Sequence, residues 1–105
     1  MMAGLACGEP SPIAWDILKG LTAAYLSCED AAAARGMRAL ARPLAGDKAN
    51  VSGESGASTL GALLDAAADE KAREALGLDG NARVLLFSTE GDTDPVNYRR
   101  VLEEN

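Results

Sequence analysis

Apolar residues recur at helical spacing early in the chain. Ser11 followed by Pro12 is typical of a helix start, because the serine oxygen can cap the first turn and proline is pre-set at the first helical position. Gly20 is a suitable stop for this helix. The spacing predicts one buried helix face, made of Ile13, Ala14, Ile17, Leu18 and Leu21.

The next stretch, residues 31–42, is rich in strong helix formers, and Pro43 disfavours continuation beyond it. Ser27 and Asp30 have the spacing of a capping box, with Asp in place of the usual Glu. We therefore expect a helix here that packs through Ala33, Met37, Leu40 and Ala41.

Three more helices are expected in the second half. Residues 55–67 form one, and residues 70–76 form another that is closed by Gly77, where a left-handed cap is favoured. Asp94 and Pro95 then have the residue types that cap and start a last helix before the charged C-terminal end.

Two segments have the pattern of strands. Residues 83–88 contain a continuous apolar run, which suits burial on both faces of a parallel sheet. Residues 23–26 are a shorter candidate. With the helices around them, these segments predict an α/β fold in which helices pack on a small, mostly parallel sheet.

Composition limits the class of protein. The 105 residues fit one small domain, and with one Trp, one Phe and two Tyr its core must rely on Leu, Val, Ile and Ala. No apolar run approaches the roughly 20 residues of a membrane helix, and the N-terminal residues lack the features of a signal peptide. We expect a cytoplasmic protein in which Cys7 and Cys28 are thiols.

Charge and residue types exclude several functions. The net charge of −6 disfavours binding to nucleic acid, and no basic patch offsets it. The sequence has no histidine, so it contains no Ser-His or Cys-His nucleophile pair. Two cysteines without close spacing make a structural zinc site improbable, and we expect no metal site.

Two polar turns are the candidates for chemistry. The Gly- and Ser-rich residues 52–58 open onto a predicted helix, whose N-terminal N–H groups favour an anion or a cofactor. Glu54 would repel a phosphate, so in a functional turn it faces a ring or a substrate amine; otherwise it is a solvated or helix-stabilising carboxylate. Residues 88–94 follow the predicted strand, at the end where α/β sheets bind ligands. Their acidic residues suit either a hard cation or, more simply, a capping turn.

Five short motifs together resemble a known family. In order, they are residues 4–10 (GLACGEP), 27–30 (SCED), 36–38 (GMR), 52–57 (SGESGA) and 88–94 (STEGDTD). Their order and spacing resemble the C-terminal part of diaminopropionate ammonia-lyase. That family belongs to the fold-type II pyridoxal-phosphate enzymes, with threonine dehydratase and serine racemase, so the resemblance implies a tryptophan synthase β-like architecture.

The resemblance implies an enzyme of amino acid catabolism. Such a lyase converts 2,3-diaminopropionate to pyruvate and ammonia by α,β-elimination, with pyridoxal 5′-phosphate as the electron sink, and it is expected to be a homodimer when complete. The resemblance places Ser88 at the pyridine nitrogen, with Thr89 as a neighbour that can substitute. It places Glu54 near the cofactor ring, and Cys7 and Gly8 in a loop on the cofactor and substrate side.

The motifs do not include the family's Schiff-base lysine or its phosphate-binding loop, and Lys19, Lys48 and Lys71 lie in none of them. We therefore expect residues 1–105 to be a C-terminal fragment of the catalytic domain. It is expected to be inactive alone and to bind cofactor poorly, and a complementary N-terminal chain is a possible partner. Two alternatives stay open. One is a fragment of a related dehydratase acting on threonine or serine, and the other is a non-catalytic α/β interaction module.

Overall fold

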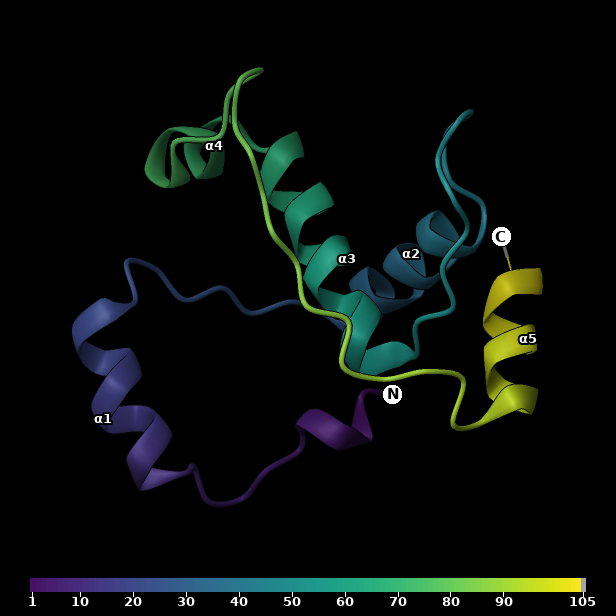
Figure 1. Ribbon diagram of the computed structural model, residues 1–105, viewed down its shortest axis with the longest axis horizontal. Coiled ribbons are helices and arrows are strands. Elements are labelled where there is room, and N and C mark those ends of the chain that lie inside the picture. The colour runs from purple at the N-terminus through teal and green to yellow at the C-terminus, as the bar shows by residue number, and fades with distance from the viewer. Residues whose placement is uncertain (105) are drawn as a thin grey trace.

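The computed structural model describes residues 1–104, and this part of the chain is helical. It contains a short 3-10 helix, Ala3–Leu5, and five α-helices (Figure 1). The α-helices are α1 (Pro12–Leu21), α2 (Asp30–Ala41), α3 (Glu54–Ala68), α4 (Glu70–Leu76) and α5 (Pro95–Glu103). All five expected helices are therefore present, with ends within two residues of the expected ones.

Local capping signals explain most of these ends. The Ser11 hydroxyl accepts a hydrogen bond from the Ala14 N–H at 3.3 Å, and the Asp94 carboxylate accepts one from the Asn97 N–H at 3.0 Å. Gly77 ends α4 in the left-handed region, with φ of 66°. The capping box expected before α2 is wrong, because Glu29 is the N-cap and its side chain makes no capping hydrogen bond.

The centre of the fold is the crossing of α2 and α3. A Cβ atom on Gly36 would overlap the Ala57 carbonyl oxygen, and one on Gly61 would overlap the Ala32 carbonyl oxygen. The two backbones can approach this closely only because both positions are glycine. The core around the crossing is built largely from small residues, and the buried apolar side chains are Ala32, Ala33, Ala34, Met37, Ala57, Ala66 and Val101.

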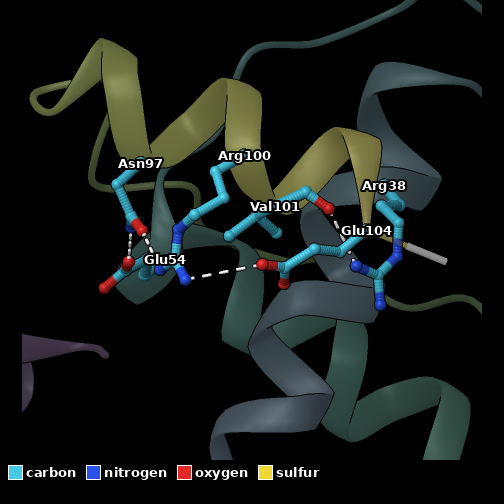
Figure 2. Close-up of polar contacts among 6 residues, drawn as sticks. All are labelled: Arg38, Glu54, Asn97, Arg100, Val101 and Glu104. Atoms are coloured by element: carbon cyan, nitrogen blue, oxygen red, sulfur yellow. Dashed lines mark hydrogen bonds and ion pairs between the residues drawn. The ribbon is translucent and has the colours of Figure 1, made fainter.

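Helix α5 packs on α2 through apolar and polar contacts. Val101 is completely buried and belongs to the same core cluster as Met37. Arg38 donates a hydrogen bond to the Val101 carbonyl at 2.8 Å, and Arg42 donates one to the Leu102 carbonyl at 2.9 Å (Figure 2 draws the first). These carbonyls lie in the last turn of α5, where they lack partners within the helix. Arg38 of α2 and Arg42, the residue just after α2, therefore cap the negative end of α5.

Helix α1 lies apart from the other helices (Figure 1). The expectation of a buried face on it is wrong. None of its residues is buried, and within residues 1–104 it packs against no other helix. Its amphipathic pattern is real, but nothing in the described chain covers the apolar side. No helix in this part of the chain combines the length and apolar character needed to cross a membrane.

The α/β fold expected from the sequence is wrong for residues 1–104, because no strand forms there. Residues 83–88 run as an irregular segment from α4 back toward the start of α3 (Figure 1), and residues 23–26 form an irregular link between α1 and α2. A strand needs a second strand for its backbone hydrogen bonds. The described chain supplies none for either segment, so the apolar run does not form a sheet.

The close contact between α2 and α3 can be tested by substituting Gly36. Gly36→Ala is expected to lower the free energy of unfolding by about 1–3 kcal/mol, because the added methyl group pushes α2 away from α3. Gly20→Ala is the control, since a Cβ there meets no atom within 4 Å. Denaturant unfolding followed by circular dichroism measures both variants. Equal stability of the two would contradict the close packing.

A second test uses two valines of α5. Val101→Ala removes two buried methyl groups and is expected to lower the free energy of unfolding by about 2 kcal/mol. Val96→Ala, at a position 78% exposed on the same helix, is expected to change it by less than about 0.5 kcal/mol. If thermal unfolding shows the same loss of stability for both variants, α5 is not anchored through Val101.

Candidate functional site

Two turns far apart in sequence meet at the N-terminal end of α3. The Gly53 N–H donates a hydrogen bond to the Glu90 carbonyl at 2.8 Å. A Cβ atom on Gly53 would overlap the carbonyl oxygen of Gly91. The glycine in the predicted turn is therefore needed for the close approach of the second turn.

The N-terminal end of α3 is occupied by a side chain of the protein itself. The Glu90 carboxylate accepts a hydrogen bond from the Ser55 N–H at 2.8 Å, and Thr93 donates to its other oxygen at 3.2 Å. A carboxylate is stabilised at this positive end of the helix dipole. The anion site expected from the turn and helix is thus filled by Glu90 in this structure.

A pair of serine hydroxyls also links the two turns. The oxygen atoms of Ser52 and Ser88 lie 2.7 Å apart, which is a hydrogen bond in which either can donate. Ser52 is 1% exposed, whereas Ser88 is exposed. A Cβ atom on Gly56 would lie 2.7 Å from the Ser52 oxygen and 3.0 Å from that of Ser88, so this glycine leaves room for the pair.

Glu54 connects three parts of the chain. Its carboxylate accepts one hydrogen bond from the Asn97 side-chain amide and one from the backbone N–H of Met2, the latter at 2.6 Å. Arg100 donates to the side-chain oxygen Oδ1 of Asn97 at 2.5 Å, and it forms an ion pair with Glu104 at 3.4 Å (Figure 2). Glu54 thus ties the first turn of α3 to α5 and to the N-terminal segment.

A cleft of about 200 Å³ lies between these elements. Its wall includes four acidic residues, and the polar Asn97 and Thr93 lie beside them. Such a lining favours a cationic group over an anion. The acidic residues are Glu54, Glu90, Asp92 and Asp94.

The structure brings only part of the predicted site together. Glu54 lines the cleft, whereas Ser88, Thr89, Cys7 and Gly8 do not. Ser88 lies close by, through its contact with Ser52 at the start of α3. Cys7 and Gly8 are exposed in the loop before α1, and the thiols of Cys7 and Cys28 are both free.

Neither a metal site nor a lysine is found at the cleft. Within residues 1–104 no three His, Cys, Asp or Glu residues are grouped to hold a metal ion. In the acidic turn at 90–94, the Glu90 carboxylate caps the start of α3 and the Asp94 carboxylate caps the start of α5. Lys19 is paired with Asp16 on α1 at 2.8 Å. None of the residues that line the cleft is a lysine.

Sequence reasoning missed Asn97 and the role of Glu90. The sequence does predict the Asp94 cap of α5, whose carboxylate accepts a hydrogen bond from the Asn97 N–H. The hydrogen bond from the Asn97 side chain to Glu54 joins residues 43 positions apart, and no local pattern predicts it. Glu90 was interpreted only as part of an acidic turn. Its function as the cap of α3 depends on a contact across 35 positions that no local pattern shows.

Comparison with known proteins identifies relatives of this chain, although no family model matches it. Diaminopropionate ammonia-lyase of Escherichia coli K12 is 47% identical over 107 residues, an alignment that includes 99% of this chain. The chain spans only 27% of the length of that relative.

Solved structures agree with this result. The E. coli diaminopropionate ammonia-lyase in complex with D-serine superimposes with a TM-score of 0.92 at 46% identity, over 98% of this chain and 27% of that one. The same enzyme with an aminoacrylate-PLP azomethine reaction intermediate gives a TM-score of 0.90 at 47% identity, over 97% of this chain and 27% of that one. The chain is therefore a homologue of diaminopropionate ammonia-lyase that corresponds to about a quarter of that enzyme.

Proposed function

We propose that this chain forms part of the active site of a pyridoxal-phosphate-dependent enzyme that eliminates ammonia from 2,3-diaminopropionate. The observation that carries the proposal is the near-complete match to diaminopropionate ammonia-lyase, in sequence at 47% identity and in structure at a TM-score of 0.92. The relative has been solved with a PLP-bound reaction intermediate, which supports the same cofactor for the complete enzyme here.

The residues at the two turns fit one edge of such a cofactor. Ser88 is an exposed hydroxyl held by the buried Ser52, and Gly56 keeps the space around them open. When Ser52 donates to Ser88, the Ser88 proton is free to be donated to a ring nitrogen. A neutral hydroxyl makes this hydrogen bond without protonating the ring. We assign Ser88 to the pyridine nitrogen, with Thr89 as its neighbour.

Besides tying α3 to α5, Glu54 is assigned a role at the cofactor. Its carboxylate is oriented by Asn97 and by the Met2 N–H, and it lines the cleft, so we place it beside the cofactor ring as a fixed negative group. The acidic lining of the cleft suits the amino groups of a diamino acid. Cys7 and Gly8 belong to an exposed loop, and we assign them to the substrate side.

The chemistry also needs groups from elsewhere in the enzyme. When bound, pyridoxal phosphate withdraws electrons from the substrate α-carbon, so that the α-proton can leave and the β-amino group can depart. The residues described above bind and orient the ring. The lysine that holds the cofactor is assigned to the part of the enzyme that this chain does not match, because none of its own lysines lines the cleft.

A chimeric enzyme tests the proposal. The matching segment of the E. coli enzyme is replaced by this chain, and pyruvate formation from 2,3-diaminopropionate is measured. We expect an active chimera, in which Ser88→Ala lowers kcat/KM by at least about tenfold through loss of one hydrogen bond to the ring. The absorbance spectrum of the bound cofactor is expected to change as well.

The control is Ser27→Ala in the same chimera, since this serine is exposed in the link before α2 and makes no hydrogen bond with Ser52 or Ser88. It is expected to leave kcat/KM and the spectrum unchanged. A folded chimera that forms pyruvate from serine or 2-oxobutyrate from threonine, and no pyruvate from 2,3-diaminopropionate, would contradict the proposed substrate. A Ser88→Ala chimera with an unchanged spectrum would contradict the assigned role of Ser88.

The isolated chain is expected to be inactive. Purified chain mixed with pyridoxal phosphate and 2,3-diaminopropionate should form no pyruvate above a sample without protein, because no lysine of its own is placed to hold the cofactor at the cleft. Measurement of pyruvate by a coupled assay tests this. Steady turnover by the chain alone would show that it carries a complete site.

A further inference from the structure

A line of polar contacts runs along one face of α5 to the first turn of α3 (Figure 2). Arg100 Nη2 donates to Asn97 Oδ1 at 2.5 Å, and Asn97 Nδ2 donates to Glu54 Oε1. At the other end of the line, Arg100 lies 3.4 Å from the Glu104 carboxylate. The three residues of α5 share a face because they are three and four positions apart.

The neighbours of the Asn97 amide allow it only one orientation. A guanidinium group has only donors, so the amide atom that faces Arg100 has to be the oxygen. An ionised carboxylate only accepts, so the amide atom that faces Glu54 has to be the nitrogen. A turned amide would place oxygen against oxygen and N–H against N–H. Arg100 therefore sets the direction in which Asn97 donates.

Both oxygen atoms of the Glu54 carboxylate are held. Oε1 accepts the hydrogen bond from the Asn97 side chain, and Oε2 accepts one from the Met2 N–H at 2.6 Å. These two donors belong to different parts of the chain, α5 and the N-terminal segment. The carboxylate cannot turn about its last bond without losing at least one of these charge-assisted hydrogen bonds. Its charge therefore has a fixed direction.

This direction matters because Ser88 lies at the same end of α3. The Ser88 hydroxyl is bonded to Ser52, two positions before Glu54, and it lies 3.0 Å from the place of a Cβ atom on Gly56, two positions after Glu54. A carboxylate that turned to a pyridine nitrogen would stabilise its protonated form. A serine hydroxyl instead donates to the neutral nitrogen. The orientation of Glu54 thus decides which of the two groups the ring nitrogen meets.

We infer that Asn97 is a positioning residue for Glu54, with its own amide oriented by Arg100. It holds the carboxylate in one direction and so leaves the ring nitrogen of the cofactor to Ser88. The inference rests on the proposed function for the place of the cofactor. It adds a role for α5, which sets the protonation of the ring and hence how strongly the ring withdraws electrons from the substrate.

The chimeric enzyme tests the inference through the absorbance spectrum of its bound cofactor. Asn97→Ala keeps the backbone N–H that the Asp94 carboxylate caps, so α5 is expected to form as before. We expect this variant to change the spectrum and to lower kcat by at least about fivefold, with KM changed by less than about twofold, because Glu54 is free to turn. In a Glu54→Ala background the same substitution is expected to change neither the spectrum nor kcat.

Two neighbouring arginines of α5 provide a matched control. Arg100→Met removes the donor that orients the Asn97 amide, so we expect the same spectral change as in Asn97→Ala and a kcat lowered by at least about twofold. Arg99→Met removes a positive charge one position away. Arg99 is exposed and takes no part in these hydrogen bonds. Its variant is expected to keep the spectrum and kcat of the original chimera.

Thermal unfolding of this chain without cofactor tests the contact itself. Asn97→Ala is expected to lower Tm by about 3–8 °C, through loss of one hydrogen bond to a charged group. In a Glu54→Ala background the loss is expected to be at most about half as large, because the acceptor is already absent. Losses that simply add would contradict the contact between the two side chains.

The spectra decide the inference separately from the reaction. An unchanged spectrum in the Asn97→Ala chimera would overturn it, and so would a change of the same size with and without Glu54. Equal results for Arg100→Met and Arg99→Met would overturn the role of Arg100. A chimera that shows the Glu54-dependent spectral change but forms no pyruvate contradicts the proposed function alone. An active chimera without that spectral change contradicts this inference alone.

Discussion

The contact between the backbones of α2 and α3 is the constraint on which the rest of the structure depends. Gly36 and Gly61 each face a carbonyl oxygen of the opposite helix, so neither position has room for a side chain. This crossing sets where the rest of α2 lies, and α2 carries the Met37 and Arg38 contacts to α5. The position of α3 in turn fixes the end at which the two turns meet.

The candidate site repeats this use of small residues. Gly53 and Gly56 allow the turn at 88–91 to lie against the start of α3, and Glu90 then completes the first turn of the helix with its carboxylate. The hydrogen bond between Ser52 and Ser88 and the hydrogen bonds of the Glu54 carboxylate lie next to this contact. The site is therefore a consequence of packing between distant turns, and its functional groups are held by contacts that also stabilise the fold.

The sequence predicted features that depend on neighbouring residues. The caps at Ser11, Asp94 and Gly77 were readable because the capping groups lie within four residues of their partners. The strand expected at 83–88 was wrong for the described chain, since strand formation depends on a partner segment that the pattern cannot supply. The buried face expected on α1 failed for the same reason, because amphipathic spacing shows which side can be buried and not what covers it.

Distance in sequence also limited the prediction of the site. The motifs that resemble the ammonia-lyase family identified Glu54 and Ser88, and comparison with known proteins confirmed the relationship to that family. The partners of these residues, Asn97 and Ser52, were not predicted as such, because the tertiary packing of segments 43 and 36 positions apart brings them close, and no local motif shows this. The roles assigned to Glu54 and Ser88 remain predictions.

The uncovered run at residues 84–87 bears on the fate of the chain in a cell. Chaperones and proteases act on chains that expose apolar side chains together with accessible backbone, and Leu85 and Phe87 present both. A copy without its cover would be cleared faster than a covered one. The amount of this chain in a cell is then expected to depend on how fast uncovered copies are degraded, as well as on how fast the chain is made.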